Sequence, residues 1–194
     1  MRSERYLYDR SLPFVEEHSV LHKNQNKDTY IKGVNMLTIN ILCVGKIKED
    51  YLKNAVNEYI KRLSKYCKIK IIELQDEKIP ENINEKIAED IKNKEAERML
   101  KHIKKDTYCI CLELNGKELT SEEFSKKIQD ISNISSSITF VIGGTLGIGE
   151  EILNLSKEKI CFSKMTFPHQ LIRIFLLEQI FRGFKIANNE TYHR

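Results

Sequence analysis

Residues 137–149 read SITFVIGGTLGIG, an uncharged apolar run that passes directly into a loop with four glycines in seven residues. Runs of this kind, rich in β-branched residues, are typical of a strand buried on both faces of a parallel sheet. Glycines after such a strand let the backbone turn tightly and approach a ligand closely. Gly143 opens the loop, which is either a ligand-binding loop or a plain strand-to-helix turn.

The segments on either side of this stretch alternate between strand and helix patterns. Apolar runs rich in β-branched residues predict strands, and apolar residues three and four apart predict amphipathic helices. An Asn-Gly turn dipeptide is expected to end the strand at 107–114, and Thr120 with Glu123 forms a capping-box pattern. The other predicted strands are 36–45, 68–74 and 159–163, and the predicted helices are 49–66, 83–103, 120–131, 150–155 and 168–185.

Strands that alternate with helices predict an α/β fold, a single domain whose mostly parallel sheet is covered by helices. In such folds ligands bind beyond the carboxyl ends of the strands. We expect this domain to span residues 36–194. Residues 1–35 show no sustained period of 2 or 3.6 and read as a poorly ordered N-terminal extension.

The composition excludes several classes of protein. With 41% hydrophobic and 31% charged residues, the 194-residue chain resembles a soluble globular protein, not a collagen or a disordered one. No apolar run approaches the roughly 18 to 20 residues of a membrane span, and the N-terminus lacks the apolar core of a secretory signal. We therefore expect a cytoplasmic protein without membrane contact. Five cysteines in apolar surroundings, with no Cys-x-x-Cys pair, predict buried reduced thiols and no metal site.

The positive charge is concentrated near the C-terminal end. Residues 161–194 carry five basic and two acidic groups, whereas residues 36–160 carry 21 of each. A positively charged segment of this kind can bind phosphate groups, and Arg173 and Lys185 are candidates for contacts with an RNA backbone. On charge alone, a solvated basic helix end is an equally good interpretation.

A second candidate site follows the last predicted strand, where residues 162–170 read FSKMTFPHQ. Small hydroxyls, backbone donors and apolar side chains are the mix that a purine-containing cofactor pocket uses. His169 stands near the start of a helix opened by Pro168, as a site residue or as a capping or packing group.

The last helix and the end of the chain carry further candidates. Glu178 and Arg182 have the i,i+4 spacing that by default indicates a helix-supporting ion pair. The terminal Tyr192, His193 and Arg194 combine an aromatic ring with cationic groups, which suits stacking on a base beside a phosphate. A frayed terminus is the alternative interpretation.

Five segments together resemble the RlmH family of bacterial SPOUT methyltransferases. They are VGKIKEDY (44–51), CLELNGK (111–117), FVIGGTLGIG (140–149), FSKMTFPHQL (162–171) and the terminal YHR. The resemblance runs in collinear order from about Met36 to Arg194. It implies S-adenosylmethionine-dependent methylation of N3 of a pseudouridine in 23S ribosomal RNA, carried out on the assembled ribosome by a homodimer. It also implies a SPOUT-type fold with a C-terminal trefoil knot, which nothing in the periodicity predicts.

The resemblance also assigns residues to roles. It places the cofactor at strand ends that the sequence pattern had already singled out. The implied cofactor-binding residues are Leu112, Gly143, Phe162, Ser163, Lys164, Met165, Thr166 and Phe167. The candidates for positioning the base or removing its N3 proton are His169, Glu178, Arg182, Tyr192, His193 and Arg194.

Two other functions remain open at this stage. One is a SPOUT methyltransferase acting on another RNA, such as transfer RNA. The other is a non-catalytic protein that binds ribosomes or RNA and has kept the fold. The intact glycine loop and the FSKMTF segment argue against the second, because a pure RNA binder needs no cofactor pocket. The target nucleotide, the catalytic base and the dimer geometry are not fixed by the sequence.

Overall fold

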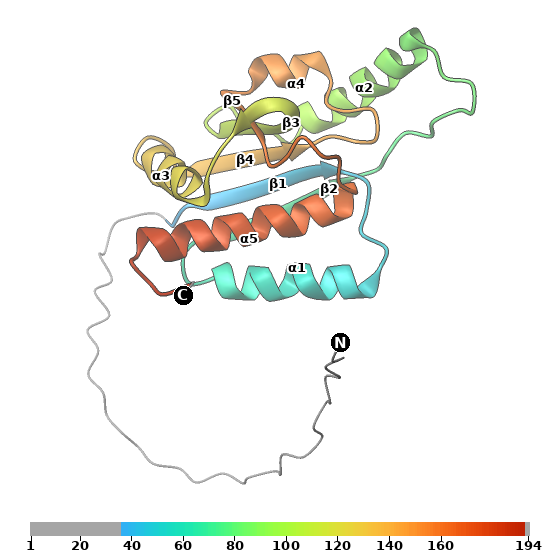
Figure 1. Ribbon diagram of the computed structural model, residues 1–194. Coiled ribbons are helices and arrows are strands. Elements are labelled where there is room, and N and C mark those ends of the chain that lie inside the picture. Colours follow the sequence, from blue (N-terminus) through green and yellow to red (C-terminus); the bar gives the residue numbers. More distant parts are fainter. Residues whose placement is uncertain (1–35, 193–194) are drawn as a thin grey trace, which may run out of the picture. The chain divides into compact units, whose positions relative to one another are not determined.

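The computed structural model describes residues 36–192, so the extension expected over residues 1–35 lies outside the described range. Within that range five strands and five helices alternate in the predicted order (Figure 1). The elements are β1 (Thr38–Val44), α1 (Asp50–Leu63), β2 (Lys68–Leu74), α2 (Glu85–Leu100), β3 (Tyr108–Glu118), α3 (Ser121–Ser132), β4 (Ser137–Ile142), α4 (Glu150–Leu155), β5 (Glu158–Cys161) and α5 (His169–Ala187). The predicted α/β fold is confirmed.

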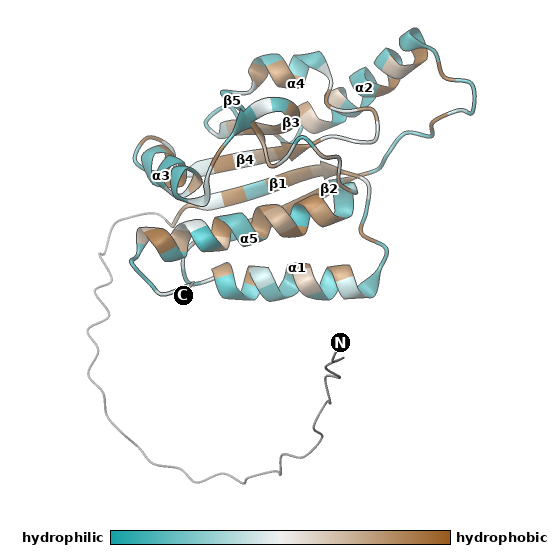
Figure 2. Ribbon diagram, in the orientation of Figure 1, coloured by the Kyte–Doolittle hydropathy of each residue, from teal (hydrophilic) through white to brown (hydrophobic). Residues whose placement is uncertain are grey.

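The strands form one sheet in the order β2-β1-β4-β3-β5, and each of these four pairings is parallel. Helices α1, α3 and α5 cover one face, and α2 and α4 cover the other (Figure 1). In β1, Ile39 and Ile41 belong to the first core, whereas Leu42 and Val44 belong to the second. Because both faces are buried, the central strands are apolar along most of their length (Figure 2).

Strand β3 does not end where the sequence predicts. It continues through the Asn-Gly dipeptide to Glu118, and β5 pairs with it twice, because both Leu112 and Lys117 are partners of Ile160. A Cβ on Gly116 would lie 2.5 Å from the carbonyl carbon of Ile160. The predicted turn is therefore wrong: glycine is needed here because two strands approach closely, not because the chain reverses.

Local signals elsewhere are confirmed. The Thr120 hydroxyl accepts the Glu123 N–H at 3.1 Å, and the Glu123 carboxylate accepts the Thr120 N–H at 2.8 Å, so the capping box is complete. Helix α5 packs against both α1 and α3, which agrees with a sequence that is apolar nearly all round.

All five cysteines are buried free thiols, as predicted. Burial raises the pKa of Cys43 to about 11 and that of Cys67 to about 12, so both are protonated at neutral pH. Over residues 36–192 no group of three His, Cys, Asp or Glu side chains is placed to hold a metal ion. None of the helices in the same range has the length and apolar character needed to cross a membrane.

Candidate active site

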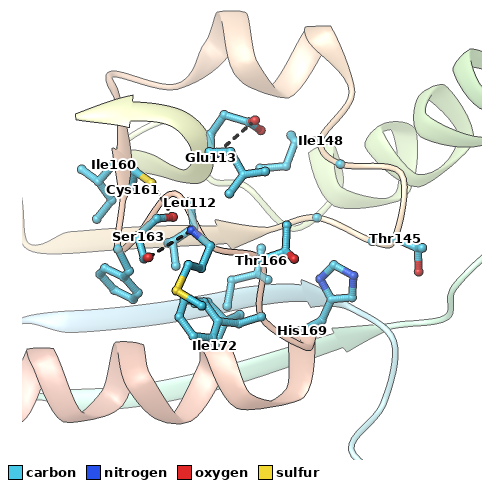
Figure 3. Close-up of a pocket in the computed structure, with 18 of the residues that line it drawn as sticks. Leu112, Glu113, Thr145, Ile148, Ile160, Cys161, Ser163, Thr166, His169 and Ile172 are labelled. Carbon is cyan, nitrogen blue, oxygen red and sulfur yellow. Dashed lines mark hydrogen bonds between the residues drawn. The ribbon is translucent and has the colours of Figure 1, made fainter. Parts of the chain in front are cut away.

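A cavity of about 420 Å³ lies at the carboxyl ends of β3, β4 and β5 (Figure 3). This is the edge at which parallel α/β sheets bind ligands, and the volume is typical of small-molecule sites. Its walls come from residues 112–114 of β3, where the pairing of β3 with β4 ends, the glycine loop after β4, the segment after β5 and the first turn of α5. The lining residues are Leu112, Glu113, Leu114, Ile142, Gly143, Gly144, Thr145, Leu146, Gly147, Ile148, Ile160, Cys161, Phe162, Ser163, Met165, Thr166, Phe167, His169 and Ile172.

The glycine loop is a tight turn that forms one wall of the cavity. The Gly147 N–H donates to the Gly144 carbonyl at 3.0 Å, and Gly147 has a φ of +92°, which favours glycine. A Cβ on Gly143 would lie 2.6 Å from the Gly147 carbonyl oxygen. The two interpretations of this loop are thus compatible, because the turn folds back on itself and presents its backbone to the cavity.

The segment after β5 forms a second wall. The Ser163 hydroxyl accepts the Met165 N–H at 3.0 Å, which closes a short turn. Five of the six residues in 162–167 line the cavity. The exception is Lys164, whose side chain is exposed and is not among the lining residues. Its assignment to the cofactor therefore has no support from the cavity geometry.

His169 projects from the first residue of α5 toward the cavity, on the side of Thr145 and Thr166 (Figure 3). Burial lowers the pKa of this imidazole, and the positive charge of Arg173 lowers it further. The ring is therefore neutral at pH 7. A neutral imidazole can accept a proton or a hydrogen bond from a group bound in the cavity.

Comparison with known proteins identifies the family of this fold and cavity. The family described as "Predicted SPOUT methyltransferase" matches residues 37–193. The chain belongs to the SPOUT methyltransferase family. It is 55% identical over 159 residues to the "Putative ribosomal RNA large subunit methyltransferase H" of Methanococcus maripaludis and to the "Ribosomal RNA large subunit methyltransferase H" of Clostridium tetani.

These alignments cover 81% of this chain and 100% of each relative. A relative of the same name from Clostridium acetobutylicum is 54% identical over the same length. Among solved structures, a probable methylase family protein from Haemophilus influenzae Rd KW20 superposes with a TM-score of 0.44 at 11% identity, over 80% of this chain and 70% of that chain.

Arg173 of this SPOUT protein is not available to RNA, which corrects the prediction that it contacts the RNA backbone. Its side chain is 1% exposed, and Nη1 lies 2.6 Å from Oε1 of Glu73. Nη2 donates to the carbonyls of Val44 and Gly45, each at 2.8 Å. The positive charge of the C-terminal segment does not reveal that Arg173 is buried and paired, because its partner Glu73 is 100 residues away in the sequence.

The predicted Glu178–Arg182 ion pair is present near the other end of α5, with 2.6 Å between Arg182 Nη2 and Glu178 Oε1. The Tyr192 hydroxyl donates to the second carboxylate oxygen at 2.7 Å, and the Arg182 guanidinium lies 4.8 Å from the centroid of the tyrosine ring. Burial and the bond to Glu178 raise the pKa of Tyr192 to about 12. The three side chains form one cluster.

The residues predicted to position the base do not all lie at the cavity. Of those within residues 36–192, His169 lines the cavity, and Glu178 lies nine residues further along the helix, or about 13 Å. Lys185 is engaged by Glu190 at 2.6 Å, and its contact with RNA stays a prediction. His193 and Arg194 lie outside the described residues.

The sequence reasoning missed several residues that line the SPOUT cavity. Ile172 is three residues after His169 and thus on the same face of α5. This spacing could have predicted that Ile172 lines the same site. Glu113 and Leu114 belong to a candidate segment of the sequence, at the end of a predicted strand, but were not assigned to the site. They line the cavity because β3 leaves its pairing with β5 there. That departure depends on contacts with β5 that have no local sequence signal.

Proposed function

We propose that the chain uses S-adenosylmethionine to methylate N3 of a pseudouridine in 23S ribosomal RNA on the assembled ribosome. The observation that supports this most directly is the cavity, which is lined by seven of the eight positions that the RlmH resemblance assigns to the cofactor. The relatives' names, which specify the large-subunit ribosomal RNA, support the substrate. The cytoplasm, where ribosomes work, is the corresponding location.

The cavity has the chemistry that the cofactor requires. Apolar side chains such as Leu112, Ile148 and Phe167 suit an adenine ring, and the backbones of the glycine loop and of residues 162–167 offer polar partners. When bound, S-adenosylmethionine supplies a methyl group already activated on a positively charged sulfur. The trefoil knot implied by the resemblance is part of this proposal.

The protein's own task is to hold the base and manage a proton. Holding two reactants in alignment can remove on the order of 7 kcal/mol or more from a barrier. The N3 proton of the pseudouridine has to leave during the reaction. His169, neutral and facing the cavity, is placed to accept that proton or to orient the base.

The proposal includes a homodimer, and the length of α5 supports it. The Tyr192 ring packs on Phe181 with 5.3 Å between ring centroids, and Phe181 is twelve residues, or about 18 Å, along the helix from His169. Tyr192 is thus held well away from the cavity-lining His169, which supports a second copy as the source of the tail that helps to hold the base.

Exposed apolar side chains beside the cavity favour such a partner. Leu114, Met165 and Phe175 are 50%, 71% and 43% exposed. Large apolar residues grouped at one edge of a domain commonly mark an interface, and homodimers are the commonest assemblies.

The direct test is transfer of labelled methyl groups from S-adenosylmethionine to assembled ribosomes that lack the modification. Free large subunits and transfer RNA are compared, and the labelled nucleotide is mapped by mass spectrometry. Label on a large-subunit pseudouridine, with assembled ribosomes only, is the expected result. Label on transfer RNA would favour the alternative substrate, and cofactor-independent RNA binding without any label would favour the non-catalytic alternative.

Two tryptophan variants test the cavity itself. Thr166→Trp should fill the cavity and lower cofactor affinity at least tenfold, whereas Lys164→Trp, in the same exposed segment but not lining the cavity, should bind normally. Because the protein contains no tryptophan, each variant also carries its own fluorescent reporter for titration with cofactor. Equal affinities would contradict the assignment of this cavity. Gly143 is a poorer choice, since any side chain there collides with the loop itself.

A further inference from the structure

The loop between β1 and α1, residues 45–48, lies beside the cavity. Strand β1 is the neighbour of β4, so its carboxyl end lies at the same edge of the sheet as the glycine loop. The Gln170 side chain donates to the Lys46 carbonyl at 3.5 Å, a long contact, and Arg173 binds the Gly45 carbonyl at 2.8 Å. Both belong to the first turns of α5, which begin with His169.

Buried polar contacts fix the conformation of this loop. The Gly45 N–H donates to the Leu74 carbonyl at 2.7 Å, and the Ile47 N–H donates to Glu73 Oε1 at 3.0 Å. The same glutamate pairs with Arg173. Burying the Arg173 guanidinium carries a desolvation cost, and the partly exposed Glu73 offsets only part of it, so the value of the pair lies in the geometry it imposes. Here it specifies where residues 45–48 stand.

The fixed loop presents basic and aromatic side chains to solvent. Lys46 and Lys48 are exposed on either side of the buried Ile47, and Tyr51, in the first turn of α1, is 69% exposed. Neither lysine forms an ion pair with another residue in 36–192. The acidic neighbours are Glu49, which is exposed, and Asp50, which pairs with the lysine three residues on. The first turn of α1 directly follows the loop, so Tyr51 is three residues from Lys48.

We propose that residues 45–48 and Tyr51 form an RNA-contact surface next to the cavity. Lys46 and Lys48 bind phosphates that flank the target nucleotide, and Tyr51 stacks on an unpaired base. Ammonium groups beside an exposed ring are the combination with which proteins hold single-stranded segments of RNA. Arg173 is the positioning residue of this surface. The inference rests on the proposed function, since it takes the same RNA as its ligand.

The test compares two double variants with the same change of charge. Lys46→Ala/Lys48→Ala alters the proposed surface. Lys104→Ala/Lys105→Ala removes two exposed lysines just before β3, at the amino end of the sheet. Affinity for unmodified ribosomes is measured over a range of salt concentrations, together with cofactor affinity and methyl transfer. We expect the first variant to bind about tenfold more weakly at 0.1 M salt, and its slope of log affinity against log salt to fall by about 1.4 to 1.8.

Cofactor affinity should stay unchanged in both variants, and the control should keep the wild-type salt slope. Tyr51→Ala should weaken binding about tenfold without changing the slope, and Tyr51→Phe, which keeps the stacking face, should restore it. Wild-type methylation with an unaltered slope in Lys46→Ala/Lys48→Ala would overturn the inference and leave the proposed function intact. A wild-type protein that methylates no RNA would overturn both.

The role of Arg173 has a separate readout. Arg173→Met should lower the salt slope as much as the double lysine variant, and combining the two changes should lower it no further. A combined variant whose slope falls by the sum of both effects would show that Arg173 does not act through the loop. Should Arg173→Met not fold, Glu73→Gln, which keeps an acceptor for the Ile47 N–H, replaces it in the same comparison.

Discussion

Helix α5 carries two arginines that pair with glutamates in contrasting ways. Arg173 is 1% exposed and pairs with Glu73 of strand β2, which is 31% exposed. Arg182 is 22% exposed and pairs with Glu178, which is 17% exposed and lies one turn earlier on the same helix. The local pair can be read from its spacing, and such pairs typically contribute about 0.3–0.5 kcal/mol. The long-range pair has no signature in the sequence, yet it fixes the loop beside the active site. The ion pair that can be recognised from the sequence is therefore not the one that matters more to the structure of the site.

The strongest test of this difference is to replace each of the two arginines in turn and compare the stability that is lost. Arg173→Met should lower the free energy of unfolding by about 2–4 kcal/mol, because it leaves Glu73 and two carbonyls without their buried partner. Arg182→Met should lower it by less than about 1 kcal/mol. Urea unfolding of the two variants measures both values. Equal losses would mean that burial does not separate the two pairs.

A second prediction concerns the exposed end of the helix, where Glu190 accepts hydrogen bonds from Tyr66 and ion pairs with Lys65 and Lys185. The bond from Lys185, followed by that from Tyr66, lowers the pKa of Glu190 to about 2. Its stabilising contribution is therefore complete above about pH 4.5 and is lost as the pH falls toward 2.

An NMR titration of the Tyr66 ring, which stacks on Phe184, should follow this release of the tail. Glu190→Gln should show the released signals at neutral pH. Glu122→Gln, an exposed carboxylate on α3, should behave as wild type. A tail that stays in place in Glu190→Gln would show that packing of the tail, rather than its ion pairs, holds it.

The smallest expected effect is on the titration of His169. Burial is the main reason for its lowered pKa, and the charge of Arg173 adds to it. Arg173→Met should therefore raise the pKa of His169 without restoring the ordinary value, and Arg182→Met should leave it unchanged. Histidine ring signals in an NMR titration measure the difference. An identical histidine pKa in the two variants would show that the guanidinium charge is screened from the cavity.

The same division between local and long-range information explains how far the sequence predicts the molecule. Alternating strands and helices, the capping box at Thr120 and the buried cysteines were predictable, because each rests on neighbouring residues or on burial of both sheet faces. The strand order and the continuation of β3 were not, because they depend on pairing with β5, whose Ile160 lies 44 residues beyond Gly116.

The site divides in the same way. The glycine loop and the segment 162–167 were recognised because each is a contiguous run next to a strand end. Lys164 was included with its neighbours although it does not line the cavity, since the order of residues in a loop does not show which side chains face a ligand. The burial of Arg173 was missed because its partners come from β1 and β2.

The position of α5 in the chain has a consequence for the order in which the protein can assemble. Strands β1 and β4 pair in the middle of the sheet, with Thr38 opposite Ser137. Helix α5, which packs against both α1 and α3, is synthesised after all five strands. Contacts this distant in sequence close slowly. A nascent chain that stops before His169 leaves the apolar faces of α1 and α3 uncovered. The core on that face of the sheet is therefore incomplete until α5 has been synthesised.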